Sequence, residues 1–314
     1  MANDKTQLGY ACAIAAQVSW GLFPIYVDPL KDYNATAIVA HRIIWSFVLL
    51  FCIFGFAGLL RSSRFVSLSE IRAGLSHPVT LLVCLVASLL ILANWLGFIW
   101  AVVHEHKVDA SLGYYICPQV VVLLGVIFLG ERLKPMQWIG FALTSAGVLY
   151  MVRSGASVPL LSLLVAFSFG TYALLKKRVR ISPLGGLTFE TGFLFLPAIC
   201  FMAYHCGYLQ IAGLGSGVTE ATPGVFTPDW RLNLLLIGSG VATVVPLALY
   251  AIALKHIPLS TVGLLQFIGP TIQFLIGVFL FHEPFDRSRL VGFVIVWVGV
   301  AIYLASLQAR STSE

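Results

Sequence analysis

Charged residues are scarce in this sequence of 314 residues. Asp, Glu, Lys and Arg make up 10% of the chain, whereas hydrophobic residues make up 59% of it. An ordinary soluble domain carries about 25% charged residues. The composition therefore argues against a soluble domain and predicts a protein embedded in a membrane.

Several chemical motifs are also missing. The sequence has no G-x-x-x-x-G-K-[ST] loop, which argues against an ATP-driven machine. Its six cysteines lie almost entirely within apolar runs and form no CxxC pair, so we interpret them as small hydrophobic residues. The run His104-Glu105-His106 lacks a third His or Cys ligand at a recognisable spacing, and a solvated loop is its preferred interpretation. No metal or other cofactor is predicted.

The positive charge of the chain does not indicate a nucleic-acid partner. The formal net charge is +6, but the basic residues are scattered at the ends of apolar segments and form no continuous patch. Attraction to anionic lipids explains the charge more simply. We therefore predict the lipid bilayer, and not nucleic acid, as the surrounding partner.

The chain contains one long segment twice. Residues 112–141 recur as 264–293 without a gap, and a second match relates residues 19–21 (Ser-Trp-Gly) to residues 168–170 (Ser-Phe-Gly). Such self-similarity predicts a duplicated architecture, with repeats at 1–153 and 154–314 that together form one membrane domain. Matched residues in the long segment include Pro118 with Pro270, Glu131 with Glu283, Gly140 with Gly292 and Gly147 with Gly299.

The apolar runs predict an all-α integral membrane protein with ten transmembrane helices. A helix needs roughly 20 apolar residues to cross the hydrocarbon core. The candidate spans lie at about 8–30, 35–59, 77–102, 108–129, 134–152, 156–177, 186–209, 231–254, 258–281 and 288–308.

The distribution of basic residues predicts the orientation of the spans. With the N-terminus inside, roughly twice as many Lys and Arg residues fall on the cytoplasmic side as on the other. We therefore expect both termini in the cytoplasm. Five helices per half is an odd number, so the second repeat enters the membrane inverted relative to the first. Inverted repeats are typical of secondary transporters, because two opposed copies give two nearly equivalent arrangements.

Arg42 is the one basic residue placed deep in a predicted span. An arginine at that depth costs roughly 2.5–3.5 kcal/mol on insertion scales, so we expect it to face the helix bundle and to have a partner. The duplication aligns His41 with Glu190, which makes Glu190 the expected partner. One interpretation is a buried ion pair that locks the two halves together. In the other, Arg42 holds an anionic group of a substrate while His41 or Glu190 handles a proton.

Amide and aromatic residues share faces on several predicted helices. Packing explains any single stripe, but several together indicate a cavity with a few hydrogen-bonding groups in an aromatic wall. Mid-helix Pro118, Pro246 and Pro270 either allow bending or form static kinks. With His41, Arg42 and Glu190, the expected substrate-binding residues are Trp20, Trp45, Asn94, Trp95, Tyr115, Gln119, Tyr172, Tyr250, Gln266 and Gln273.

Glycines seven residues apart mark the fifth and tenth predicted helices. Gly140 and Gly147 lie on one face of the fifth helix, and Gly292 and Gly299 lie on one face of the tenth. Small residues two turns apart permit close approach of another helix. The approach is either internal packing or a homodimer contact through these two helices.

These motifs resemble the EamA family of the drug/metabolite transporter superfamily. Residues 41–46 (His-Arg-Ile-Ile-Trp-Ser), 94–95 (Asn-Trp), 110–115 (Ala-Ser-Leu-Gly-Tyr-Tyr) and 266–271 (Gln-Phe-Ile-Gly-Pro-Thr) are similar to its RarD branch, which consists of bacterial inner-membrane proteins. The resemblance covers nearly the whole chain. It implies a central cavity lined by the first, third, fourth, sixth, eighth and ninth helices, and export of amino acids, metabolites or drugs.

The sequence therefore predicts an inner-membrane secondary transporter that exports small polar or amphipathic metabolites by alternating access, and not an enzyme. One alternative is an intramembrane enzyme that uses His41 and Glu190 as acid and base, although the inverted duplication would then be unexplained. The other is a lipid-handling membrane protein without transport activity.

Overall fold

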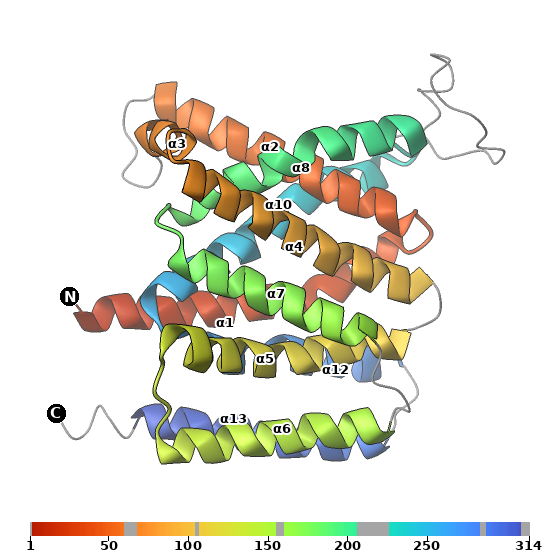
Figure 1. The fold of residues 1–314 in the computed structure, drawn as a ribbon. Helices are drawn as coiled ribbons and strands as arrows, with labels where there is room; N and C mark the ends of the chain where they lie inside the picture. The colour runs from red at the N-terminus through yellow and green to blue at the C-terminus, as the bar shows by residue number, and fades with distance from the viewer. Residues whose placement is uncertain are drawn as a thin grey trace. The chain divides into compact units, whose positions relative to one another are not determined.

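In the computed structural model, every regular element of the described residues is a helix (Figure 1). The structure describes residues 2–59, 68–103, 107–154, 160–205, 226–282 and 287–308. Helix occurs within each segment for which the sequence predicts a membrane span. The prediction of an all-α fold is therefore confirmed for these residues.

The helices differ widely in length. The longer ones are α1 (Ala2–Val27), α2 (Ala35–Leu59), α4 (Pro78–Val103), α5 (Lys107–Leu129), α6 (Pro135–Ser154), α7 (Leu160–Arg178), α8 (Pro183–His205), α10 (Trp230–His256) and α13 (Arg287–Gln308). The shorter ones are η1 (Asp28–Leu30), α3 (Leu68–Leu75), α11 (Leu259–Leu265) and α12 (Ile268–Phe279).

Seven helices of the described residues are long and apolar enough to cross a membrane. The chain is therefore a multi-pass membrane protein, and the full set of ten spans stays a prediction. The seven ranges are Asp4–Leu30, Ala35–Phe56, Pro78–Phe98, Leu160–Arg178, Pro183–Tyr204, Trp230–His256 and Leu259–Phe279, and the shorter apolar helices Gly113–Leu129 and Leu290–Ser306 fall in two further predicted spans.

The predicted span at 258–281 is divided into two helices. Its first part is α11 and its second part is α12, with Gln266 and Phe267 between them. Pro270 is consequently the third residue of α12, where its missing N–H needs no partner within the helix. The expectation of a mid-helix Pro270 was wrong, whereas Pro118 and Pro246 do lie inside α5 and α10.

The chain forms two compact units, which we describe separately. Unit 1 comprises Met1–Pro24, Leu90–Arg178 and Leu249–Glu314, and unit 2 comprises Ile25–Leu89 and Val179–Ala248. Each unit draws on both predicted repeats. The units are therefore a different division of the chain from the repeats at 1–153 and 154–314, which stay a prediction.

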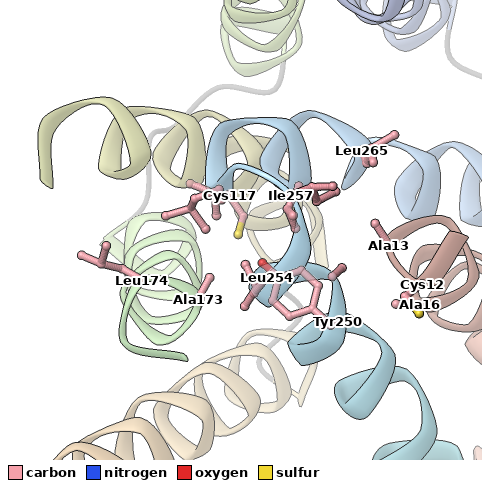
Figure 2. Close-up of a cluster of buried hydrophobic side chains, with 14 of the residues drawn as sticks. Cys12, Ala13, Ala16, Cys117, Ala173, Leu174, Tyr250, Leu254, Ile257 and Leu265 are labelled. Carbon is pink, nitrogen blue, oxygen red and sulfur yellow. The ribbon is translucent and has the colours of Figure 1, made fainter. Parts of the chain in front are cut away.

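Small side chains dominate a buried cluster in unit 1 (Figure 2). Ala13 and Ala16 of α1 and Ala173 of α7 are each at most 1% exposed. Such residues let helix backbones approach closely, which favours helix association in lipid. The larger members Tyr250, Leu254 and Ile257 of the segment 249–257 fill the space that remains. This cluster fixes the part of α10 that carries Tyr250.

The glycines of α6 and α13 pack against one another within unit 1. A Cβ on Gly140 would lie 2.7 Å from the carbonyl oxygen of Gly299, and one on Gly147 would lie 2.8 Å from that of Gly292. The first glycine of each helix thus faces the second glycine of the other, so the two helices run antiparallel, side by side (Figure 1). The close approach is internal, and a homodimer through these helices stays a prediction.

In unit 2, α2 packs against α8, and the first part of α10 also reaches α2. A Cβ on Gly240 would lie 2.5 Å from the carbonyl carbon of Trp45, so glycine is required for this approach. Ser46 Oγ donates a hydrogen bond of 3.4 Å to the Gly240 carbonyl. This close contact places the polar residues of α2 and α10 beside each other.

Candidate functional site

Four aromatic rings meet in unit 1, and three of them belong to the predicted site. Trp20 lies edge-on to Phe169, with ring centroids 5.8 Å apart, and both rings lie 5.4 Å from Tyr250. Tyr172 extends the group, 5.8 Å from Phe169. The structure therefore brings Trp20, Tyr172 and Tyr250 together from α1, α7 and α10, as an aromatic wall would require.

Gln266 completes this cluster with hydrogen-bonding groups. Its Nε2 donates a hydrogen bond of 2.6 Å to the Tyr250 hydroxyl, which is fully buried. The Cys117 thiol lies 3.8 Å from Gln266 Oε1. The position of Gln266 follows from the break between α11 and α12, because the amide lies directly after α11 ends.

Gln273 has a structural partner in α1. Its Nε2 donates a hydrogen bond of 3.0 Å to the Trp20 carbonyl. That carbonyl would pair with the N–H four residues later, but the residue there is Pro24, which has none. Gln273 thus satisfies a backbone acceptor that the proline leaves open, and it does so beside the Trp20 ring.

Asn94 is hydrogen-bonded to α7. Its Nδ2 donates to the Val165 carbonyl at 2.8 Å and lies 3.4 Å from Ser168 Oγ. Asn94 is 1% exposed, so these bonds satisfy an amide that would be costly to bury alone. Its neighbour Trp95 is half-buried on α4.

Tyr115 and Gln119 contact α13 and α6. The Tyr115 ring lies edge-on to Phe293, with centroids 5.3 Å apart. Gln119 Nε2 donates to Thr144 Oγ1 at 2.9 Å, and Ser145 Oγ donates to Gln119 Oε1 at 3.0 Å. These two predicted site residues therefore serve contacts with α6 and α13, whereas Cys117 on the same helix faces the aromatic cluster.

Arg42 lies half-buried in unit 2 and contacts α10. Its Nε donates a hydrogen bond of 3.0 Å to Thr243 Oγ1, and Thr243 is 1% exposed. The close approach of Gly240 to Trp45 holds Thr243, one turn further along α10, at the level of Arg42. The Tyr26 hydroxyl, which donates to the Leu235 carbonyl, is within electrostatic range of Arg42. A threonine hydroxyl therefore binds the guanidinium directly, and a tyrosine hydroxyl lies within its electrostatic range.

His41 is 1% exposed and has a polar group at each ring nitrogen. Trp45 Nε1 donates to its Nδ1 at 3.3 Å, and the Tyr33 hydroxyl lies 3.5 Å from its Nε2. An indole N–H can only donate, so Nδ1 acts as the acceptor and the neutral ring carries its proton on Nε2. The Phe226 ring covers the same group, 5.8 Å from His41 and 6.5 Å from Trp45.

Glu190 is 3% exposed on α8, the helix that packs against α2. Burying a carboxylate requires charge or hydrogen-bond partners. The structure therefore agrees with a polar role for Glu190 inside unit 2, and its coupling to Arg42 stays a prediction. His41, Arg42, Trp45 and Glu190 are the predicted site residues that belong to unit 2.

The chemistry available differs between the units. Unit 2 offers a guanidinium bonded to a threonine hydroxyl, and a guanidinium can bind a carboxylate, a phosphate or a similar anion through charge-assisted hydrogen bonds. Unit 1 offers ring faces with neutral amides. Within the described ranges, no three His, Cys, Asp or Glu side chains gather as metal ligands would. His104-Glu105-His106 and Glu283 lie outside those ranges.

Three contributors, Phe169, Thr243 and Tyr33, were not among the predicted site residues. Phe169 is the counterpart of Trp20 in the duplication, and the two rings touch, so the sequence alignment of the repeats carried a signal for it. Thr243 lies in the polar stripe of α10, but only the structure pairs it with Arg42. Tyr33 follows a turn after η1, and no sequence pattern places it at His41.

One family model matches the chain twice. The model of the EamA-like transporter family matches residues 7–153 and again residues 156–305. The two matched ranges fall one in each predicted repeat. The whole chain is also similar to a solved crystal structure with a TM-score of 0.68, covering 98% of this chain and 99% of that one, and the 18% sequence identity limits this likeness to the fold.

Curated relatives cover nearly the full length. "Uncharacterized transporter YojE" of Bacillus subtilis is 40% identical over 98% of this chain and 96% of its own. "Protein RarD" of Escherichia coli is 35% identical over 100% of both chains. "Chloramphenicol-sensitive protein RarD" of Pseudomonas aeruginosa is 28% identical over 94% of this chain and 92% of its own. The family description and the first of these names describe transporters.

Proposed function

Because the chain belongs to the EamA-like transporter family, we propose that it is a secondary transporter of the bacterial inner membrane that exports small polar or amphipathic metabolites by alternating access. The observation that carries this proposal is the double match of one transporter model to the two halves of the chain. The large side chains exposed on α2, such as Phe51 at 65% and Phe56 at 64%, suit a surface in contact with lipid.

We propose that the ten spans form two inverted five-helix repeats with both termini in the cytoplasm. The antiparallel packing of α6 and α13 supports this arrangement, because these helices correspond to each other in the duplication. The first glycine of each meets the second glycine of the other, as a local two-fold axis requires. The contact of Trp20 with its counterpart Phe169 supports the same symmetry.

Arg42 is the proposed anchor for an anionic group of the substrate. Its hydrogen bond to Thr243 orients the guanidinium, and a guanidinium held in this way can attract an anion through charge-assisted hydrogen bonds. His41 is the proposed proton-linked group, because a buried imidazole with a donor at Nδ1 changes its hydrogen bonds when it binds a proton. Glu190 is the proposed partner that balances the charge of Arg42.

The ring cluster of unit 1 is proposed to bind apolar groups of a substrate. Trp20 and Tyr250 offer ring faces, and Gln266 offers an amide that fixes orientation. An amino-acid-like or drug-like molecule carries apolar groups of this kind together with polar groups that an amide can bind.

A ligand screen followed by flux measurements tests the proposed function. Amino acids, nucleosides and drugs, with chloramphenicol included because of the name of one relative, are tested for thermal stabilisation of the purified protein. Each hit is then measured for uptake into vesicles that contain the protein. We expect saturable flux of at least one hit. Stabilisation without flux, or conversion of a compound by detergent-solubilised protein, would contradict a transporter.

A further inference from the structure

The junction between α10 and α11 has open backbone acceptors. The Leu254 carbonyl would accept a hydrogen bond from the N–H four residues later, but Pro258 has no N–H. Lys177 of α7 replaces that donor, because its Nζ donates to the Leu254 carbonyl at 2.8 Å and to the Ile257 carbonyl at 2.7 Å. The end of α10 is therefore held by a side chain from another helix.

The start of α11 has open backbone donors, and a second side chain satisfies them. Pro258 precedes α11 and gives no side-chain cap. Glu131 accepts both N–H groups instead, with Oε1 2.7 Å from Leu259 N and Oε2 2.8 Å from Ser260 N. Hydrogen bonds to a charged group are stronger than those between neutral groups. The junction is thus held on its acceptor side by Lys177 and on its donor side by Glu131.

The local fold after α5 aims Glu131 at this junction. Gly130 has a φ of 65°, which turns the chain back, and the Glu131 N–H donates to the Gly125 carbonyl at 3.2 Å. A Cβ on Gly125 would lie 2.8 Å from Glu131 Oε2 and 3.1 Å from Ser260 N. Gly130 therefore turns the chain so that the Glu131 carboxylate reaches the junction, and Gly125 leaves room for that carboxylate.

The two helices that meet at the junction carry a predicted substrate-binding pair. Tyr250 lies in the last part of α10, and Gln266 directly follows α11, so their 2.6 Å hydrogen bond spans the junction. We propose that Glu131 and Lys177 are positioning residues that hold α10 and α11 in the arrangement in which Tyr250 and Gln266 meet. The role in substrate contact rests on the proposed function, but the positioning itself does not.

Cysteine labelling tests the positioning without a substrate. In a variant with all six native cysteines replaced by Ala, Val262→Cys places a thiol on α11 where the native side chain is 1% exposed. We expect N-ethylmaleimide to label this thiol in the purified full-length protein about tenfold faster when Glu131→Gln is added, because two charge-assisted bonds are lost. Lys177→Gln should accelerate labelling in the same way, and it gives the answer if Glu131→Gln does not fold.

Matched controls separate positioning from general loosening. Val148→Cys on α6 is also buried, at 4%, but lies on a helix that contributes nothing to the junction. Its labelling should change less than about twofold with Glu131→Gln. Arg132→Gln removes the neighbouring exposed charge and should leave both thiols as they were. Equal acceleration at 148 and 262, or unchanged labelling at 262, would overturn the proposal.

A charge exchange gives a second test. Glu131→Lys combined with Lys177→Glu preserves a possible ion pair, but it places an ammonium against backbone N–H groups and a carboxylate against carbonyls. We therefore expect labelling of Val262→Cys to stay at least about tenfold faster than in the parent. Recovery of slow labelling would show that the two side chains act only on each other, which would overturn the proposal.

Discussion

The polar side chains beside two prolines of unit 1 differ in their partners from the basic side chains of α2 in unit 2. In unit 1, Gln273 and Lys177 donate to carbonyls that Pro24 and Pro258 leave without a partner, so these side chains repair breaks in helices. In unit 2, Arg42 and His41 instead bind side-chain groups, a hydroxyl and an indole. The difference indicates that these side chains of unit 1 stabilise its helices where prolines interrupt them. In unit 2, the charge of Arg42 can recognise an anion.

The largest expected effect is on Arg42. Arg42→Ala should lower flux of a screen-identified anionic substrate at least about 100-fold, because a charge-assisted contact in a poorly solvated site is lost. Arg231→Ala is the matched control, since Arg231 is exposed at the start of α10 in the same unit. It should keep flux within about twofold at equal expression. Equal flux in both variants would remove Arg42 from the mechanism.

The next effect concerns the scaffold of unit 1. Gly140→Leu should destabilise the protein by about 1–3 kcal/mol, because its side chain would meet the Gly299 carbonyl at the contact of α6 with α13. The transition temperature in a thermal unfolding assay should fall accordingly. Gly55→Leu in α2 of unit 2 is the control, since a Cβ there meets nothing within 4 Å. A similar loss in both variants would mean that the glycine contact does not support unit 1.

Two glutamines of unit 1 should differ in their effect on transport. Gln266→Leu should lower flux about tenfold, because it leaves the buried Tyr250 hydroxyl without its partner and removes the amide from the ring cluster. Gln119→Leu should change flux less than about threefold and act mainly on stability, since its partners belong to α6. A larger loss of flux in Gln119→Leu than in Gln266→Leu would place the site on the side of α5 that faces α6.

The smallest expected effect is the coupling within unit 2. Arg42→Ala, Glu190→Gln and the double variant form a cycle whose stability is measured by thermal unfolding. We expect a coupling energy of about 1 kcal/mol, because removing one charge makes the other costlier to bury. Simple additivity would show that Glu190 balances some other group.

Periodicity and composition predicted much of the fold. Long apolar runs specify helices whatever their neighbours, so every predicted span contains helix. The division of 258–281 was missed because α11 and α12 are both apolar, so the apolar run continues through Gln266 and Phe267 without a change in pattern that marks the break. Pro258 marked the start of α11 in the sequence, but Glu131, which accepts a hydrogen bond from the first N–H group of α11, is distant in sequence.

The candidate site was predicted in part. The duplication and the rarity of buried charge singled out His41, Arg42 and Glu190, and all three lie buried or half-buried in unit 2. The spacing of residues along one helix shows which of them share a face, but it does not show which neighbouring helix that face contacts. Tyr115 and Gln119 therefore seemed equivalent to Gln266, although they contact α13 and α6. Long-range pairing of helices decides such cases.

Membrane topology tests the central claim of an inverted duplication most directly. Lys134→Cys and His282→Cys, each in a cysteine-free background, place exposed thiols near the ends of α5 and α12, at corresponding regions of the two repeats. A membrane-impermeant maleimide added to intact cells should label the thiol at 282 and spare the one at 134 until the cells are permeabilised. Labelling of both thiols from the same side would contradict inverted repeats.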